Sequence, residues 1–470
     1  MGFNTFEFLV FLPLVFTLYW LVFKNRKKQN LLLLIASYVF YGMWDWRFLI
    51  LIVISSAVDF YVGKHIPRNR GTVKAKYLLW LSLAVNLGLL GFFKYFNFFV
   101  GSFIALFQSV GIHLSPVTTQ IIVPVGISFY TFQTLSYTID IYRNRIKPTD
   151  DWLTFFAFVS FFPQLVAGPI ERASFLIPQF EKSRIFQLSQ AKEGLRFILY
   201  GLFKKVVVAD FCGFYADEIF NNYQELGGAD LFLGAYFFFG GQLYADFSAY
   251  SEIAIGAAML LGFKLSRNFA YPYFSKNIEE LWQRWHITLS QWFRDYVLLI
   301  SLRSPLRKLG VSTMVFVMFT LIGLWHGPNY TYIAWGMAHG LMFLGYQRLK
   351  RTGFVKPEFR RSEISDLGSM VALNFMVGLV VIFFRSPSLS FSFEYIGLMF
   401  GGFFEEWPRY LDKMYWPIFV LIWEWQFRDH WHGLAVAHWP VWKRWLTYLV
   451  FALATMYCFG HQREFIYFQF

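Results

Sequence analysis

Long apolar stretches separated by short basic loops run through most of the chain. The stretch 8–23 ends at the basic cluster 24–28, and two further stretches, 31–44 and 48–62, lie between that cluster and the basic loop 64–76. Between these two stretches, Asp45-Trp46-Arg47 is expected to form a short polar turn at the membrane interface. An even number of crossings returns a chain to the same side, and basic loops of membrane proteins face the cytoplasm. The pattern predicts helices that cross a bilayer, a first span that is retained, and an extracytoplasmic N-terminus.

Two places interrupt this pattern. Pro124 and Gly126 fall within the stretch 121–137, which favours a broken or re-entrant helix. The stretch 152–166 is shorter than the roughly 20 residues that span hydrocarbon, and the Gly-Pro and charged residues of 167–172 indicate irregular backbone covered by protein or water. A simple interfacial turn fits 167–172 equally well. We predict an all-α polytopic membrane protein with about 11–13 spans plus short re-entrant and interfacial helices.

Composition agrees with a membrane protein and limits its partners. The 470 residues are 57% hydrophobic and 15% charged, whereas typical soluble domains are about 25% charged. The net charge of +13 comes from Lys and Arg that lie mostly in loops, which is the positive-inside pattern and not a nucleic-acid-binding face. Cys212 and Cys458 are too few and too far apart for a disulfide framework or a metal site. We expect one integral membrane domain over 1–470, with the lipid bilayer as a partner, no nucleic acid and no metal.

His326 is the residue whose position most strongly indicates chemistry. It follows the uncharged stretch 311–325, and ionisable side chains at membrane depth mark functional sites by default. His286 lies 40 residues earlier (326 − 286), which is enough chain to bring both imidazoles into one cavity. A neutral imidazole there suits general-base chemistry on a hydroxyl. A histidine that only hydrogen-bonds a neighbouring helix is the alternative, and we favour a packing role for His339, which neighbours glycines at helical spacing.

A polar island at 242–252 interrupts another apolar stretch. It carries two carboxylates and several hydroxyls, among them Tyr244 and Asp246. Such groups need internal partners or a water-filled path inside a membrane. A polar seam that only ties helices together is equally consistent with this island.

Two motifs near the histidines resemble those of the membrane-bound O-acyltransferase family. They are Trp-x-Arg-Trp-His-x-x-Leu-Ser-x-Trp-x-Arg-Asp-Tyr at 282–296 and Gly-Leu-Trp-His-Gly at 323–327. The chain is most similar to the bacterial branch with alginate O-acetyltransferase and the peptidoglycan O-acetylation transporter. The polar island resembles the family's Tyr-x-Asp-Phe-Ser-Gly-Tyr-Ser-Asp, with Ala249 and Glu252 replacing the Gly and the final Asp. Gly-Pro-Ile-x-Arg at 168–172 resembles another motif of the branch.

This resemblance implies a ring of helices around a central tunnel, with the core of the fold over about 30–350. It implies transfer of an acyl group, most simply acetyl, from a cytoplasmic donor for O-acetylation of an extracytoplasmic polysaccharide such as alginate or peptidoglycan. The donor would be acetyl-CoA or another acyl thioester, with no bound cofactor. Expected partners are an extracytoplasmic O-acetyltransferase protein, the polysaccharide acceptor and an acyl carrier on the cytoplasmic side. The expected location is the bacterial cytoplasmic (inner) membrane.

Residue roles follow from the same resemblance. His326 would accept the hydroxyl proton of the acceptor, and His286 would orient the acceptor or hold donor charge. Asp295 would fix the tautomer of a nearby histidine. The Lys204-Lys205 pair could contact a donor phosphate, but we favour a solvated anchor at the membrane edge. The residues expected to contact substrate are Trp285, Arg284, Asp295, Trp325, Asp246, Tyr244, Asn268, Gly168, Pro169 and Arg172.

Two alternatives remain open from the sequence. D-alanyl transfer to teichoic acid keeps the chemistry but takes the acyl group from a carrier protein docked at the cytoplasmic face. A transporter or channel without chemistry would use the same passage as a conduit, and it would keep its flux when the imidazole of His326 is removed.

Overall fold

The computed structural model describes residues 1–114, 121–354, 363–403, 406–460 and 463–466, and all regular structure within these ranges is helical. The chain packs as two compact units. The first comprises Met1–Leu195 and Ala254–Ser266, and the second comprises Arg196–Ile253 and Arg267–Phe470. The predicted all-α class is confirmed. The single domain over 1–470, the number of spans and the ring around a tunnel stay predictions.

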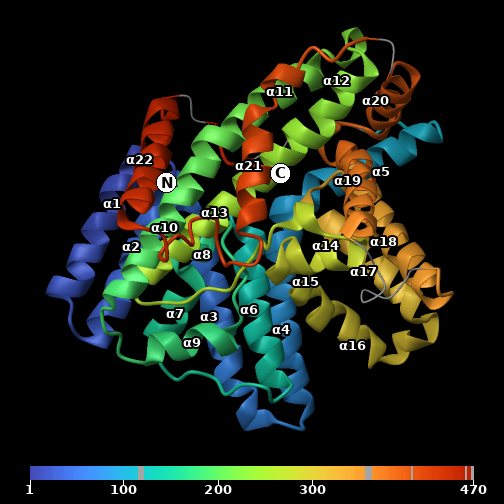
Figure 1. Ribbon diagram of the computed structural model, residues 1–470. Helices are drawn as coiled ribbons and strands as arrows, with labels where there is room; N and C mark the ends of the chain where they lie inside the picture. Colours follow the sequence, from blue (N-terminus) through green and yellow to red (C-terminus); the bar gives the residue numbers. More distant parts are fainter. Residues whose placement is uncertain (115–120, 355–362, 404–405, 461–462, 467–470) are drawn as a thin grey trace. The chain divides into compact units, whose positions relative to one another are not determined.

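Figure 1 shows the helices in chain order, from blue at the N-terminus to red at the C-terminus. The helices of the first unit are α1 (Phe6–Thr17), α2 (Arg26–Asp45), α3 (Leu49–His65), α4 (Val73–Leu90), α5 (Phe96–Ser109), α6 (Ile127–Tyr142), α7 (Trp152–Ser160), α8 (Phe162–Leu165) and α9 (Ala173–Glu181). Two helices run along the chain from one unit into the other, α10 (Leu188–Phe203) and α13 (Gly240–Leu260). The helices of the second unit are α11 (Asp210–Asn221), α12 (Gly228–Phe232), α14 (Ile278–Arg284), α15 (Ile287–Phe293), α16 (Leu299–Leu302), α17 (Val311–His326), α18 (Tyr330–Arg351), α19 (Glu363–Arg385), α20 (Leu389–Gly401), α21 (Tyr415–Gln426) and α22 (Val441–Cys458).

Several helices are long and apolar enough to cross a membrane. Within the described ranges, three helical stretches meet this condition, Arg26–His65, Val73–Ser109 and Glu363–Arg385. The first of them is interrupted where the sequence predicts a polar turn. The backbone of Asp45 is extended, and its side chain accepts a hydrogen bond from the amide of Arg47 at 3.0 Å, which starts a short 3-10 turn between α2 and α3. The predicted turn is therefore confirmed.

The two predicted irregular segments are also present in the first unit. Gly126 has a left-handed backbone (φ +77°) immediately before α6, and a Cβ at this position would lie 2.6 Å from the carbonyl oxygen of Leu165. Glycine avoids both the strain and the collision, so the helix begins only at Ile127. The segment 166–172, between α8 and α9, is non-helical and almost entirely buried. Its irregular backbone is covered by protein, as inside a membrane it must be.

In the second unit, α17 and α18 form a close hairpin, drawn in orange in Figure 1. Two glycines make this approach possible. A Cβ on Gly336 of α18 would collide with the carbonyl oxygen of Phe319, and a Cβ on Gly323 of α17 would collide with the carbonyl oxygen of Tyr332. Small residues of this kind let helix backbones pack closely in membranes. The hairpin places His326, the last residue of α17, against Trp335 of α18.

Candidate active site

His326 lies in an aromatic enclosure built by three helices. It is 3% exposed. Its ring centroid lies 5.0 Å from that of Trp325 on α17, 5.1 Å from that of Trp335 on α18, and 5.0 Å from that of Phe384 on α19. The burial predicted for this imidazole is confirmed.

His286 occupies a strained turn between α14 and α15. Its backbone is left-handed, with φ 40° and ψ 54°. A non-glycine residue in this conformation costs of order 1–3 kcal/mol, and such strain concentrates at functional sites. The turn lies outside the three described helical stretches that are long and apolar enough to cross a membrane, and the side chain is fully buried. Burial lowers the pKa of His286 to about 3, so its imidazole is neutral at physiological pH.

Asn268 decides which nitrogen of His286 carries the proton. The Oδ1 atom of Asn268 lies 3.1 Å from His286 Nδ1, and it accepts a hydrogen bond from the Thr288 hydroxyl at 2.9 Å. Because Oδ1 can only accept, Nδ1 must be the donor. A neutral imidazole protonated at Nδ1 carries its lone pair on Nε2. At its other end, the Asn268 amide donates to the Ser251 hydroxyl at 3.1 Å, which fixes the orientation of the amide.

Trp325 connects the two histidines. Its ring centroid lies 5.8 Å from that of His286 and 5.0 Å from that of His326. Phe247 of α13 packs against His286 with a centroid distance of 4.6 Å. Within the second unit, the two sequence motifs therefore meet at one indole ring, as their spacing predicted.

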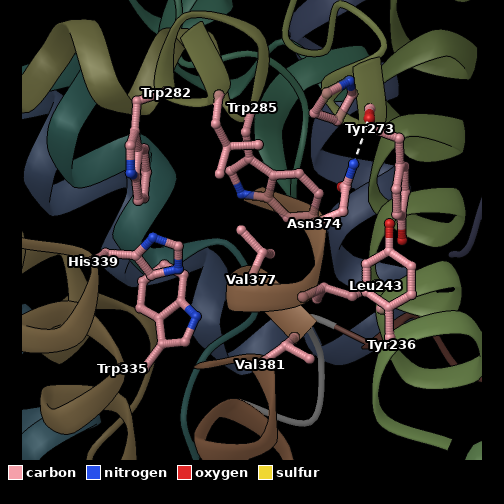
Figure 2. A pocket seen from close by; sticks show the side chains of 13 residues that line it. Tyr236, Leu243, Tyr273, Trp282, Trp285, Trp335, His339, Asn374, Val377 and Val381 are labelled. Carbon is pink, nitrogen blue, oxygen red and sulfur yellow. Dashed lines mark hydrogen bonds between the residues drawn. The ribbon is translucent and has the colours of Figure 1, made fainter. Parts of the chain in front are cut away.

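An aromatic cavity lies beside this cluster (Figure 2). It encloses about 590 Å³ of space including its open mouth. Trp285 lines it, as does Trp335, which also contacts His326. The remaining lining residues are Tyr236, Gly240, Leu243, Pro272, Tyr273, Leu281, Trp282, His339, Asn374, Val377 and Val381. The apolar lining of this cavity, with a few polar groups, is typical of small-molecule sites.

The polar island on α13 is bound to two buried lysines. The Lys204 ammonium donates to Ser248 Oγ and to Glu252 Oε1, both at 2.8 Å, and lies 3.4 Å from Glu424 Oε1. Tyr244 donates its phenolic proton to Glu424 Oε2 at 2.7 Å. These contacts give Tyr244 an internal hydrogen-bond partner, and its contact with substrate stays a prediction.

Asp246 has the same kind of environment. It is 1% exposed, pairs with the Lys205 ammonium at 3.0 Å, and accepts a hydrogen bond from the amide of Ile466 at 2.7 Å. Lys205 also pairs with Asp210 at 2.8 Å. The favoured interpretation of Lys204-Lys205 as a solvated membrane-edge anchor was wrong: both ammonium groups are buried because four carboxylates compensate their charge.

Arg284 and Asp295 form local ion pairs. Arg284 pairs with Glu280 at 2.8 Å, one helical turn earlier on α14, and donates to the carbonyl oxygen of Ala270 at 3.1 Å. Asp295 pairs with its neighbour Arg294 at 2.8 Å. The residue that fixes the tautomer of His286 is Asn268, and a role of Asp295 in fixing the tautomer of a nearby histidine stays a prediction. An amide serves here because a buried neutral imidazole needs a hydrogen-bond acceptor and not a charge.

Gly168, Pro169 and Arg172 belong to the first unit and lie in the buried irregular segment before α9. A Cβ on Gly168 would collide with Gln164, so the motif requires glycine there for close packing. Glu171 binds the neighbouring loop through the backbone amide and the hydroxyl of Ser266. Contact of this motif with substrate stays a prediction.

Several hydrogen-bond partners of the candidate site residues were not predicted from the sequence. Glu424 and Ile466 lie 180 and 220 residues from the island residues that they contact, and nothing in the sequence links them. Thr288, by contrast, lies two residues after His286 in the first motif, and its hydroxyl was a visible candidate. In the described part of the chain, no group of three or more His, Cys, Asp and Glu side chains is arranged to hold a metal.

Comparison with known proteins agrees with this geometry. The family model described as MBOAT, membrane-bound O-acyltransferase family, matches residues 81–390, which include both histidine motifs. The chain is 38% identical over 406 residues to the probable alginate O-acetylase of Pseudomonas putida, covering 86% of this chain and 80% of that relative. It is 33% identical over 429 residues to the peptidoglycan O-acetyltransferase of Helicobacter pylori, covering 85% and 80%.

A more distant match is the teichoic acid D-alanyltransferase of Streptococcus thermophilus, which is 27% identical over 260 residues, or 52% of this chain and 62% of that relative. The names of these three relatives state O-acetylation of alginate or peptidoglycan, or D-alanyl transfer to teichoic acid. The family match covers well over half of the chain and includes the residues that form the histidine cluster. The chain therefore belongs to the membrane-bound O-acyltransferase family and is an O-acyltransferase.

Proposed function

We propose that this O-acyltransferase moves an acetyl group from a cytoplasmic thioester, acetyl-CoA or an acyl carrier, through a membrane tunnel for O-acetylation of an extracytoplasmic polysaccharide such as alginate or peptidoglycan. The supporting observation is the pair of buried imidazoles that share the Trp325 ring, one of them held as the Nδ1–H tautomer. Neutral buried imidazoles are suited to take a proton from a hydroxyl.

In the proposed reaction, His326 takes the proton of the acceptor hydroxyl as its oxygen attacks the thioester carbonyl. The C–S bond breaks, and the leaving thiolate receives the proton from the imidazolium. His286 accepts a hydrogen bond at Nε2 from a neighbouring hydroxyl of the polysaccharide and so orients the acceptor, because Asn268 holds the proton at Nδ1. The low dielectric of the aromatic enclosure strengthens these interactions.

The similarity to acetyl transferases favours acetyl over D-alanyl. The two acetyl-transferring relatives match about 85% of the chain, and the D-alanyltransferase matches 52%. D-alanyl transfer is therefore the second candidate. The same proposal includes the bacterial inner membrane as the location, with the N-terminus on the extracytoplasmic side. It also includes an extracytoplasmic O-acetyltransferase partner and an acyl carrier on the cytoplasmic side. The basic loops and the names of the relatives support these points.

Replacing His326 with alanine tests the proposal. Loss of the general base should lower transfer of labelled acetyl into extracellular polymer by about 10²–10⁴-fold, with the amount of protein in the membrane unchanged. His286→Ala should also lower transfer. His430→Ala, which changes an exposed histidine of the same unit, is the matched control and should keep full activity. Retention of acetyl flux in His326→Ala would support a conduit and overturn the catalytic role.

A further inference from the structure

The walls of the cavity in Figure 2 determine what can bind there. Five of the thirteen lining residues carry indole or phenol rings, most of the others are apolar, and the residues described around the cavity include no Asp, Glu, Lys or Arg. Transfer of an unpaired charge into such surroundings is strongly unfavourable. The cavity therefore suits an uncharged chain and excludes a phosphate or a carboxylate.

Two buried nitrogens on one wall have unused hydrogen-bonding capacity. Trp282 is 8% exposed and His339 is 3% exposed. Trp282 Nε1 and His339 Nδ1 have no hydrogen-bond partner among the described residues, and the two rings lie side by side with centroids 5.3 Å apart (Figure 2). An indole nitrogen can only donate. A ligand that forms a hydrogen bond with Trp282 Nε1 must therefore carry an acceptor such as a carbonyl oxygen.

The cavity is one side chain away from the candidate base. Trp335 lines the cavity and stacks edge-on against both His339, at 4.6 Å, and His326, at 5.1 Å. A group held in the cavity is thus separated from His326 by a single indole ring. A site that binds the acyl donor has to lie this close to the residue that catalyses the transfer.

We propose that this cavity binds the uncharged end of the acyl thioester, with a carbonyl oxygen of that end accepting hydrogen bonds from Trp282 Nε1 and His339 Nδ1. The inference rests on the proposed function and makes His339 a binding residue, where the sequence favoured a packing role. The carbonyl could belong to the acyl group or to the amide-bearing arm that carries it. A polysaccharide such as alginate is excluded because its carboxylates would be buried without partners.

Narrowing the cavity tests this assignment. Val377 of α19 lines the cavity, and Val371 on the same helix is 62% exposed. Val377→Phe should raise the KM for S-acetyl-pantetheine about tenfold, as expected when a filled pocket loses room for part of a ligand, whereas Val371→Phe should leave it unchanged. If Val377→Phe does not fold, Val377→Ala serves instead, and a changed preference between acetyl- and butyryl-pantetheine is the expected result.

The choice of thioester separates the two sources of the carbonyl. If Val377→Phe raises the KM for S-acetyl-pantetheine but not for the short-armed S-acetyl-N-acetylcysteamine, the cavity binds the amide-bearing arm. If the increase in KM is larger for the butyryl thioester than for the acetyl thioester, the cavity binds the acyl group. Unchanged KM values in Val377 variants that still transfer acetyl overturn the inference and leave the proposed function intact. Absence of transfer in the unmodified protein contradicts the proposed function itself.

His339 can be tested for hydrogen bonding separately from packing. His339→Phe keeps the stacked ring but removes the nitrogen, and the lost hydrogen bond should raise the KM for S-acetyl-pantetheine about tenfold with little change in kcat. His339→Gln, which restores a polar group, should recover part of the loss. A purely structural role would lower the yield of folded protein and kcat in both variants without a selective effect on KM, and that result would contradict the proposal.

Discussion

At the scale of single residues, the tautomer of His286 depends on an amide. Asn268 Oδ1 accepts from both His286 Nδ1 and the Thr288 hydroxyl, so the lone pair of the imidazole lies on Nε2. A carboxylate in this place would favour the charged imidazolium, which burial opposes. Asn268 thus keeps the ring neutral and fixes its orientation without introducing a charge.

Removing this acceptor should impair catalysis more than folding. Asn268→Leu removes the hydrogen-bond partner of His286 Nδ1. Loss of a residue that orients a functional imidazole typically lowers activity by about 10–100-fold. We expect kcat for acetyl transfer to fall within that range. Asn268→Asp, which keeps an acceptor at Nδ1, should retain more activity than Asn268→Leu. Equal loss in the two variants would show that the contribution of Asn268 is packing and not hydrogen bonding.

At the scale of helices, the α17–α18 hairpin determines where His326 lies. The contact between Gly323 and Gly336 brings the two backbones together, and the same approach places Trp335 against His326. The Gly-Leu-Trp-His-Gly motif therefore combines two physical tasks. Its first glycine allows the helices to pack, and its histidine faces the enclosure that this packing creates.

A single methyl group at the helix contact should separate the hairpin. Gly336→Ala would force its Cβ into the carbonyl oxygen of Phe319, and overpacking of this kind costs about 1–3 kcal/mol. A lower midpoint of thermal unfolding in detergent is the expected result. Gly345→Ala on the same helix meets no atom within 4 Å and should be neutral or slightly stabilising. Similar midpoints for the two variants would contradict the close helix contact.

At the scale of the whole molecule, the two compact units place the sequence motifs in different settings. The histidine cluster, the cavity and the lysine–carboxylate network all belong to the second unit, and the Gly-Pro-Ile-Glu-Arg segment belongs to the first. In the second unit, Lys204, the first residue of the π-helical turn that follows α10, pairs with Glu252 of α13 and with Glu424 of α21. Three helices distant in sequence are therefore tied at one buried ammonium group.

Loss of this ammonium group should destabilise the protein strongly. Lys204→Met leaves Glu252 and Glu424 buried without their cation, and breaking a buried pair in this way costs about 3–5 kcal/mol. Lys192→Met, at an exposed position of α10, the helix that directly precedes Lys204, should change stability by less than about 0.5 kcal/mol. Both effects can be measured as unfolding midpoints in detergent. Adding Glu424→Gln to Lys204→Met should recover part of the loss, because one uncompensated charge is removed.

The position of residues 463–466 was not predictable from the sequence. Phe465 and Ile466 are 5% and 1% exposed. The amide of Ile466 donates to Asp246, and the ring of Phe465 packs against Tyr250 with a centroid distance of 4.6 Å. An aromatic segment at the end of a membrane protein suggests an interface with lipid, but the carboxylate of the polar island provides the acceptor that draws this segment into the protein.

The sequence by itself determined the helical class, the membrane setting, the breaks at Asp45 and Gly126, and the two histidines. Each of these follows from local properties, namely hydrophobic length, turn residues and the cost of an ionisable group among apolar ones. Only the tertiary structure decided that Asn268 holds His286, that Lys204 and Lys205 are buried, and that His339 faces a cavity. Those outcomes depend on partners up to 220 residues away. A one-dimensional pattern can show that a polar group needs a partner, but only the packed chain shows which partner it has.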